Sequence, residues 1–196
     1  MSALGGAVAA ARRGAGRVYR SLCNAVDTVL HPRRHRAAVQ RLRGQELVRS
    51  ILVVCHGNIC RSPYLAAVLQ RALPDVSVSS AGFVGAGRTV PEHSNVLAAQ
   101  RGLDLAGHRS RLVTRDLLDQ TDLLVVMDGR QAQYLTRGFG VSEERIVVAG
   151  DLEPRAGETR AIRDPWRESL EVFEESFARL DRCADSLVMQ LTKPGE

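Results

Sequence analysis

The sequence of 196 residues lacks any apolar run close to the roughly 20 residues that a membrane-spanning helix requires. It also lacks paired C-x-x-C sites, so a structural zinc site is not expected. The cysteines are few and widely spaced, and a chain of this length can bury a sufficient core without disulfides. We therefore predict a protein without a membrane span or a metal, with free thiols in a reducing cytoplasm. The four cysteines are Cys23, Cys55, Cys60 and Cys183.

A secretory signal is also missing from the N-terminal residues. The apolar stretch at residues 4–11 precedes Arg12 and Arg13. A signal peptide places its positive charges before the apolar stretch. Secretion is therefore not expected, and the cytoplasmic prediction stands.

The net charge of +5 is unevenly distributed along the chain. Residues 1–50 hold ten arginines and two acidic residues, a net charge of +8. The remaining 17 basic and 20 acidic residues give −3. The basic character belongs to an N-terminal extension at residues 1–49, so nucleic acid is not expected to bind the rest of the chain.

Part of this extension has the pattern of an amphipathic helix. Residues 16–30 place five apolar side chains on one helical face, and Pro32 is expected to end the helix. One interpretation is a segment that contacts a membrane surface or an acidic partner. The alternatives are a loosely docked, solvated helix and an organellar targeting peptide. The five apolar residues are Val18, Leu22, Val26, Val29 and Leu30.

From residue 51 onward, short apolar runs alternate with amphipathic segments. This alternation predicts an α/β domain at residues 50–192, with a four-stranded parallel sheet and helices on both faces. Strands are expected at 51–55, 76–80, 122–127 and 145–149. Helices are expected at 63–73, 91–101, 114–119, 131–137 and about 165–190.

The loop after the first strand carries the residues best suited to chemistry, because ligands bind beyond the carboxyl ends of parallel strands. A five-residue turn around one point can direct backbone N–H groups at a tetrahedral oxyanion. Gly57 permits the left-handed or close-approach geometry that such a phosphate-binding loop requires. The loop residues, expected to bind substrate, are His56, Gly57, Asn58, Ile59 and Cys60.

The residues on either side of this loop complete a phosphate site. Arg61 can grip two oxygens of an oxyanion and keeps its charge at any working pH. The loop N–H groups, the helix dipole and Arg61 all favour the thiolate form of Cys55. Ser62 can donate a hydrogen bond to that thiolate. The whole string C-x-G-N-x-C-R-S-P is far more specific than a lone C-x5-R in a chain rich in arginine.

This string resembles the phosphate-binding signature of the low-molecular-weight protein tyrosine phosphatases. Three later segments resemble that family's motifs in the same order, so the resemblance spans residues of about 50 to 190. Residues 164–169 most resemble the bacterial branch associated with capsule or exopolysaccharide tyrosine kinases. The three segments are Ser80-Ala81-Gly82, His108-Arg109-Ser110-Arg111 and Asp164-Pro165-Trp166.

The resemblance implies a two-step hydrolysis without metal or cofactor. Cys55 attacks phosphorus to give a phosphocysteine, while Asp164 protonates the leaving phenolate oxygen. Asp164 then acts as the base for the hydrolytic water, and Arg61 holds the phosphoryl oxygens throughout. A phosphotyrosine protein is the implied substrate, with a bacterial tyrosine autokinase as a candidate, and a monomer is expected.

The resemblance also assigns supporting roles around the loop. Asn58, Ser80 and His108 match positions that brace it by hydrogen bonds. The family usually provides a Glu partner for the histidine, but Leu65 and Ala66 stand in that part of this sequence. The way in which His108 is held is therefore left open.

Three further residues have alternative interpretations at this stage. Trp166, together with Phe83, either flanks the substrate ring or packs under a loop. Cys60 is either a small core residue or the partner of an oxidised Cys55 in a reversible disulfide.

Three other functions compete with tyrosine phosphatase activity. A thiol-linked arsenate reductase needs resolving cysteines downstream, but none lies between Cys60 and Cys183. A phosphoarginine phosphatase typically has Thr at the position of Ile59, and the larger Ile favours the flat ring of phosphotyrosine. A non-enzymatic phosphocysteine carrier or binding module would need neither Arg61 nor Asp164.

Overall fold

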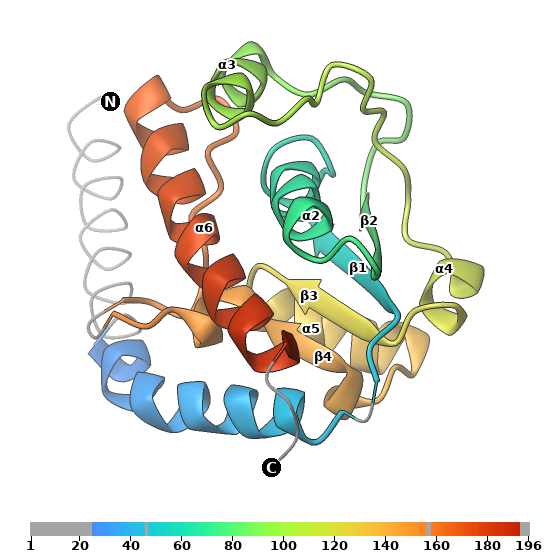
Figure 1. Ribbon diagram of the computed structural model, residues 1–196, viewed down its shortest axis with the longest axis vertical. Helices are drawn as coiled ribbons and strands as arrows, with labels where there is room; N and C mark the ends of the chain where they lie inside the picture. Colours follow the sequence, from blue (N-terminus) through green and yellow to red (C-terminus); the bar gives the residue numbers. More distant parts are fainter. Residues whose placement is uncertain (1–24, 46, 156–157, 193–196) are drawn as a thin grey trace, which may run out of the picture.

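The computed structural model describes residues 25–45, 47–155 and 158–192. Four strands form one parallel sheet in the order β2-β1-β3-β4 (Figure 1). The expected α/β architecture is confirmed. The strands are β1 (Ser50–Cys55), β2 (Ser77–Gly82), β3 (Leu123–Val126) and β4 (Ile146–Val148).

Helices cover both faces of this sheet. In Figure 1, α2 and α6 lie in front of the strands and α5 lies behind them. Among the described residues, no helix is both long enough and apolar enough to cross a membrane. The helices are residues 25–43, α2 (Arg61–Ala72), α3 (Glu92–Gln100), α4 (Arg115–Asp119), α5 (Gly129–Phe139) and α6 (Leu170–Thr192), with short 3-10 turns η1 (Glu143–Arg145) and η2 (Ala149–Leu152).

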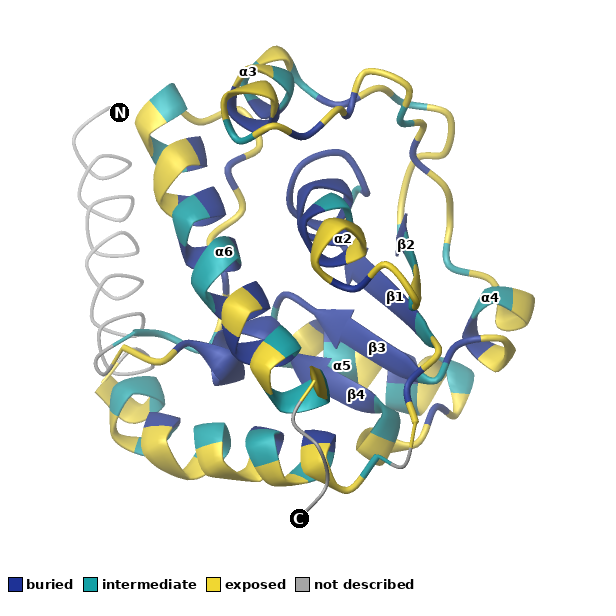
Figure 2. Ribbon diagram, viewed as in Figure 1, coloured by how far each residue is buried: buried dark blue, intermediate teal, exposed yellow. Residues whose placement is uncertain are grey.

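The central strands are buried on both sides, which explains their unbroken apolar sequence. In β1, Ile51 and Val53 join the apolar cluster that contains the inner faces of α2 and α6. Leu52 and Val54 point to the opposite cluster, beside α4 and α5. Figure 2 shows β1, β3 and β4 as almost completely buried, whereas the first half of β2 is more exposed. The sheet therefore gives the ends of its strands a rigid support.

The last helix begins later than the sequence predicts. Residues 164–169 form a loop and turn, and α6 starts only at Leu170, not at Pro165. The amide of Glu168 donates to the carbonyl of Pro165 at 2.9 Å, and Arg167 has a left-handed φ of +64°. A helix cannot continue through this conformation. The turn keeps Asp164 outside the helix, at the edge of the sheet.

The prediction that Pro32 ends the first helix is wrong, because the helix continues through it to residue 43. Of the predicted apolar face, Val26 and Val29 are 55% and 77% exposed and Leu30 is half-buried, so this face does not attach the helix to the core. His31 and Leu42 face inward instead, and Leu42 joins the same apolar cluster as α6. Tertiary packing along this face outweighs the hydrogen bond that a proline removes. Val18 and Leu22 lie outside the described residues.

Polar contacts fix this helix to the sheet and to η2. The imidazole of His31 hydrogen-bonds the carbonyl of Glu153 at 2.9 Å, and that of His35 the carbonyl of Asp151 at 3.0 Å. Arg41 donates to the carbonyl of Ile146 in the edge strand β4 at 2.7 Å. The helix thus occupies hydrogen-bonding groups that an edge strand otherwise leaves open.

Truncation of Leu42 to alanine should destabilise the whole fold if this helix unfolds together with the sheet. The side chain is fully buried, so we expect a loss of about 2–5 kcal/mol of unfolding free energy. Urea denaturation followed by circular dichroism measures it. Gln40→Ala, on the exposed face of the same helix, is the matched control and should change stability by about 0.5 kcal/mol or less. An unchanged urea midpoint for Leu42→Ala would show that the helix is not part of the cooperative unit.

Candidate active site

The candidate site lies at the carboxyl end of the inner strand β1. The strand ends at Cys55 and α2 begins at Arg61, so five residues form the connecting loop. Because β1 pairs with β2 on one side and β3 on the other, this loop is surrounded by the loops that follow both strands. Such an edge of an open parallel sheet is the usual place for a ligand.

The thiol of Cys55 accepts two hydrogen bonds. The backbone amide of Asn58 donates to Sγ at 3.2 Å, and the hydroxyl of Ser62 donates at 3.0 Å. Donors directed at sulfur stabilise the negatively charged form more than the neutral form. The structure therefore places Ser62 where the sequence predicts it, with its hydroxyl directed at the sulfur.

Asn58 is the residue that fixes the shape of the loop. It is completely buried and has a φ of +52°, in the left-handed region that Asn tolerates better than most residues. Its side-chain amide donates to the hydroxyls of Ser62 at 3.0 Å and Ser80 at 2.8 Å. Its side-chain oxygen accepts from the backbone amide of Arg111 at 2.9 Å. One asparagine thus links the loop to α2, to β2 and to the segment at 108–111.

His108 holds the backbone of the same residue. Its Nε2 lies 2.8 Å from the carbonyl oxygen of Asn58. Burial lowers the pKa of His108 below its ordinary value of 6.5, and the charges of Arg111 and Arg109 lower it further, although the bond to Asn58 opposes this. The neutral imidazole therefore donates to the loop carbonyl, and this bond holds His108 against the loop.

Arg88 is a loop contact that the sequence did not reveal. Its guanidinium donates to the carbonyls of Gly57 and Val84, both at 2.7 Å, and to that of Gly85 at 3.0 Å. A Cβ on Gly57 would lie 3.0 Å from this guanidinium, so Gly57 serves close approach. The left-handed backbone conformation of the loop is found at Asn58 and not at Gly57. Arg88 belongs to no motif and is one of 26 arginines, so no sequence pattern marks it.

The turn after β2 fits tightly against the loop. A Cβ on Gly82 would lie 2.8 Å from the backbone nitrogen of Asn58, so only glycine fits there without a shift. The amides of Phe83 and Val84 donate to the carbonyl of His56 at 2.9 and 3.2 Å. The His56 side chain is exposed, and its backbone makes these contacts with the turn.

Arg61 and Asp164 meet although 103 residues separate them in the sequence. The guanidinium of Arg61 is only 4% exposed, and it donates to the carbonyl of Ile162 at 2.8 Å and to the carboxylate of Asp164 at 2.5 Å. Within the described residues, Arg61 Nε is buried and has no acceptor. A buried donor without a partner is costly, so this nitrogen is suited to an oxyanion that enters the loop.

Comparison with known proteins identifies the family of this chain. The family described as "Low molecular weight phosphotyrosine protein phosphatase" matches residues 50–196. The chain belongs to this phosphatase family. It is 36% identical over 151 residues to "Probable low molecular weight protein-tyrosine-phosphatase EpsP" of Ralstonia nicotianae, a match that covers 76% of this chain and 100% of that protein.

Solved structures of other phosphatases share the fold. The tyrosine phosphatase AmsI of Erwinia amylovora superposes with a TM-score of 0.69 at 31% identity, over 75% of this chain and 95% of that one. The YwlE arginine phosphatase of Geobacillus stearothermophilus superposes with a TM-score of 0.66 at 28% identity, over 73% of this chain and 92% of that one. The chain is therefore a phosphatase enzyme, with an N-terminal extension outside the family match.

In this phosphatase the remaining loop residues are buried. Ile59 and Cys60 both lie in the apolar cluster around α2 and α6. Burial raises the pKa of Cys60 to about 12, assisted by the nearby charges of Asp164 and Cys55, so Cys60 stays a neutral thiol. Cys55 and Cys60 are both free in this structure, as is Cys183. The residues that the structure describes contain no group of three or more His, Cys, Asp or Glu that could hold a metal ion.

Trp166 and Phe83 have different surroundings in the phosphatase. Trp166 is 45% exposed, and its amide donates to the carboxylate of Asp164 at 3.3 Å, beside the mouth of the loop. Phe83 packs edge-on against Tyr134 with 5.0 Å between ring centres. Trp166 is therefore free to contact a ligand, whereas Phe83 is half-buried against α5.

Replacement of His108 by glutamine should remove a source of acid sensitivity. Because the pKa of His108 is lower in the folded protein than in the unfolded chain, the unfolded chain binds more protons below about pH 6.5. Wild-type stability should therefore fall relative to His108→Gln as the pH drops through this range, and the difference should be constant above it. Glutamine can keep the donor to Asn58 but does not titrate. Urea denaturation at several pH values measures this, and parallel stability curves for both proteins would contradict it.

Proposed function

We propose that this phosphatase hydrolyses phosphotyrosine in proteins through a phosphocysteine at Cys55. The observation that carries the proposal is the convergence of three groups on one loop. A thiol with two hydrogen-bond donors, a buried guanidinium with an unpaired N–H, and a carboxylate at the mouth of the loop lie together. Each suits one requirement of phosphoryl transfer: nucleophile, oxyanion ligand and proton donor.

The first step forms the bond between Cys55 Sγ and phosphorus and breaks the bond between phosphorus and the tyrosine oxygen. The hydrogen bonds from Asn58 and Ser62 support attack, since they stabilise the thiolate. The proton of a protonated Asp164 goes to the departing oxygen, which leaves as a neutral phenol. The mechanism requires an intact thiol, which supports a reducing compartment such as the cytoplasm.

Arg61 exchanges partners when phosphate binds. In the free protein one of its terminal nitrogens is bonded to Asp164, while Nε has no acceptor among the described residues. A phosphoryl group in the loop would accept from both nitrogens in a two-pronged contact. This contact releases the Asp164 carboxyl group for the leaving oxygen. The bond from Arg61 to the carbonyl of Ile162 keeps the guanidinium in place during the exchange.

The second step returns the enzyme to its starting state. Water attacks phosphorus, the bond between phosphorus and Sγ breaks, and inorganic phosphate forms. Asp164, now ionised, takes the proton from the attacking water and is ready for the next cycle. Arg61 and the loop amides stabilise the charge on the phosphoryl oxygens in both steps.

Phosphoarginine is the competing substrate, because the arginine phosphatase YwlE has the same fold. An isoleucine at position 59, where phosphoarginine phosphatases typically have Thr, supports phosphotyrosine as the substrate. The resemblance of residues 164–169 to the exopolysaccharide-associated branch supports a tyrosine autokinase as the protein substrate. Capture from a cell lysate on Asp164→Ala, followed by mass spectrometry, identifies the phosphoprotein and its phosphorylated residue.

The N-terminal extension carries exposed positive charge that supports contact with an anionic surface. Helix 25–43 buries one face against the sheet, but Arg33, Arg36 and Arg43 on the other face are exposed. An exposed row of arginines supports association with an anionic surface, with residues 50–192 as the catalytic domain.

Substitution of Cys55 by serine should abolish hydrolysis of phosphotyrosine peptides, because the alcohol is far less acidic than the thiol. Cys60→Ser is the matched control, since Cys60 is buried in the same loop and its thiol, unlike its backbone amide, has no part in the two steps. We expect Cys60→Ser to retain most of the activity that phosphate release measures. Substantial activity in Cys55→Ser would contradict the mechanism.

Substitution of Asp164 by asparagine should reduce kcat/KM most for substrates with a poor leaving group. For phenyl phosphate we expect kcat/KM to fall by about 10²–10⁴-fold, because the phenolate then departs without a proton. For 2,4-dinitrophenyl phosphate, whose anion is stable, the loss should be much smaller. Steady-state kinetics with a series of aryl phosphates measures the difference. An equal loss for all leaving groups would remove Asp164 from the acid role.

A further inference from the structure

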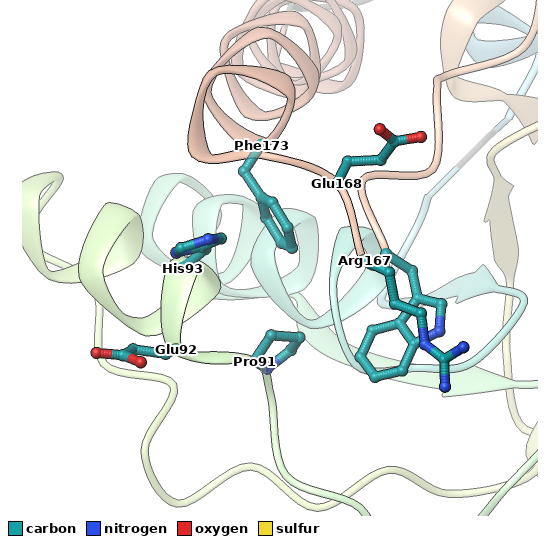
Figure 3. A pocket seen from close by; sticks show the side chains of 7 residues that line it. Pro91, Glu92, His93, Arg167, Glu168 and Phe173 are labelled. Atoms are coloured by element: carbon teal, nitrogen blue, oxygen red, sulfur yellow. The ribbon is translucent and has the colours of Figure 1, made fainter.

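A groove lies beside Trp166, between the start of α3 and the turn that precedes α6 (Figure 3). Its volume is about 280 Å³. This is slightly below the roughly 300–1,000 Å³ of pockets for drug-sized ligands, so it suits a single side chain better than a cofactor. The lining residues are Pro91, Glu92, His93, Trp166, Arg167, Glu168 and Phe173.

The interior of the groove is formed by rings. Phe173 is only 1% exposed, and the ring of His93 packs edge-on against it with 5.4 Å between ring centres. Figure 3 shows that the charged ends of Glu92, Arg167 and Glu168 point away from the space between His93 and Phe173. The groove thus offers apolar and aromatic surface with its charges at the rim, which favours an uncharged side chain.

The turn on one side of the groove has an unusual conformation. Arg167 has a φ of +64°, a conformation that is unfavourable for a non-glycine residue and persists only where the surroundings enforce it. Its guanidinium lies 5.6 Å from the centre of the Trp166 ring, and the amide of Glu168 closes the turn on Pro165 at 2.9 Å. These contacts hold the indole as a fixed wall.

The groove adjoins the candidate active site through Trp166. Trp166 lines it, and the amide of Trp166 is bonded to Asp164, the proposed acid. A polypeptide whose phosphotyrosine reaches Cys55 can therefore lie across this surface. An extended chain advances about 3.3 Å per residue and alternates its side chains, so a residue one or two positions away can reach a neighbouring depression.

We propose that this groove binds an apolar side chain, aliphatic or aromatic, of the phosphoprotein within two residues of its phosphotyrosine. The proposal rests on the proposed function and adds to it a preference for the sequence around the phosphorylated residue. The apolar and aromatic lining disfavours an acidic residue at the same position, because a carboxylate would lose its hydration there. His93 becomes a specificity residue that contacts the substrate but takes no part in phosphoryl transfer.

Phosphotyrosine peptides test the proposal. A parent peptide with alanine at the two positions on each side of phosphotyrosine is compared with peptides that carry Leu, Phe or Asp at one of these positions. We expect Leu or Phe at one position to raise kcat/KM about tenfold over alanine, the effect of burying a small apolar group in a pocket. We expect Asp at that position to give no gain.

Enzyme variants show whether the groove causes this preference. His93→Glu places a carboxylate against Phe173, and His93→Ala removes one wall; both should reduce the tenfold preference to about twofold or less. Val96→Ala is the matched control, because Val96 is an exposed residue on the same helix and does not line the groove. It should keep the full preference. Circular dichroism verifies that each variant is folded.

The outcomes separate this proposal from the proposed function. If phosphotyrosine peptides are hydrolysed but the wild type shows no apolar preference, or if both folded His93 variants keep it, the groove proposal is wrong and the proposed function stands. If no phosphotyrosine peptide is hydrolysed while phosphoarginine peptides are, the proposed function fails and this proposal with it.

Discussion

The hydrogen bonds of Asn58 are the constraint on which the site depends. A loop that must surround a phosphoryl group is short and strained, and here the strain is concentrated in the left-handed backbone of this buried residue. Three separate segments satisfy its polar groups: α2 through Ser62, the end of β2 through Ser80, and the stretch 108–111 through His108 and Arg111. The loop is therefore shaped before any ligand arrives, which lowers the cost of binding an oxyanion.

The second requirement is that Asp164, which is distant from the loop in the sequence, lies beside Arg61. The loop before it is fixed at the buried carboxylate of Glu153, which accepts two hydrogen bonds from Arg182 in α6 at 2.9 and 2.8 Å. Although burial opposes ionisation, these bonds and the charge of Arg182 keep the pKa of Glu153 below 4.5. Further along, Ile162 pairs with the end of β3 through Met127. Asp164 is thus positioned by the core of the fold.

Helix 25–43 extends this scaffold on the side away from the loop. It bonds the backbone of η2 through His31 and His35, so it supports the chain segment that leads toward Asp164. The family match begins at residue 50, so this helix is an addition of this protein to the common fold. Its buried face, not the apolar face that the sequence suggested, determines how it is attached.

The sequence predicted the parallel sheet because strands buried on both faces produce continuous apolar runs. Such runs can be recognised without knowledge of the tertiary packing around them. It also predicted the loop, since a Cys, a Gly, an Arg and a Ser at fixed spacing leave few alternatives. It could not show Arg88 or the carbonyl of Ile162, because both act through backbone contacts that leave no motif. It placed the start of α6 too early, since the left-handed turn at Arg167 depends on packing around Trp166 and not on a glycine. The predicted helix end at Pro32 was wrong for a related reason. The packing of residues on either side of Pro32 outweighs the hydrogen bond that the proline removes.

The central claim is that phosphate passes through the sulfur of Cys55. The most direct test is to mix the enzyme with excess phosphotyrosine peptide, quench by denaturation within milliseconds, and locate any protein-bound phosphoryl group by peptide mass spectrometry. The account predicts a phosphoryl group on Cys55 that forms and disappears at rates compatible with turnover. Turnover without a phosphorylated enzyme, or a phosphoryl group on another residue, would contradict it.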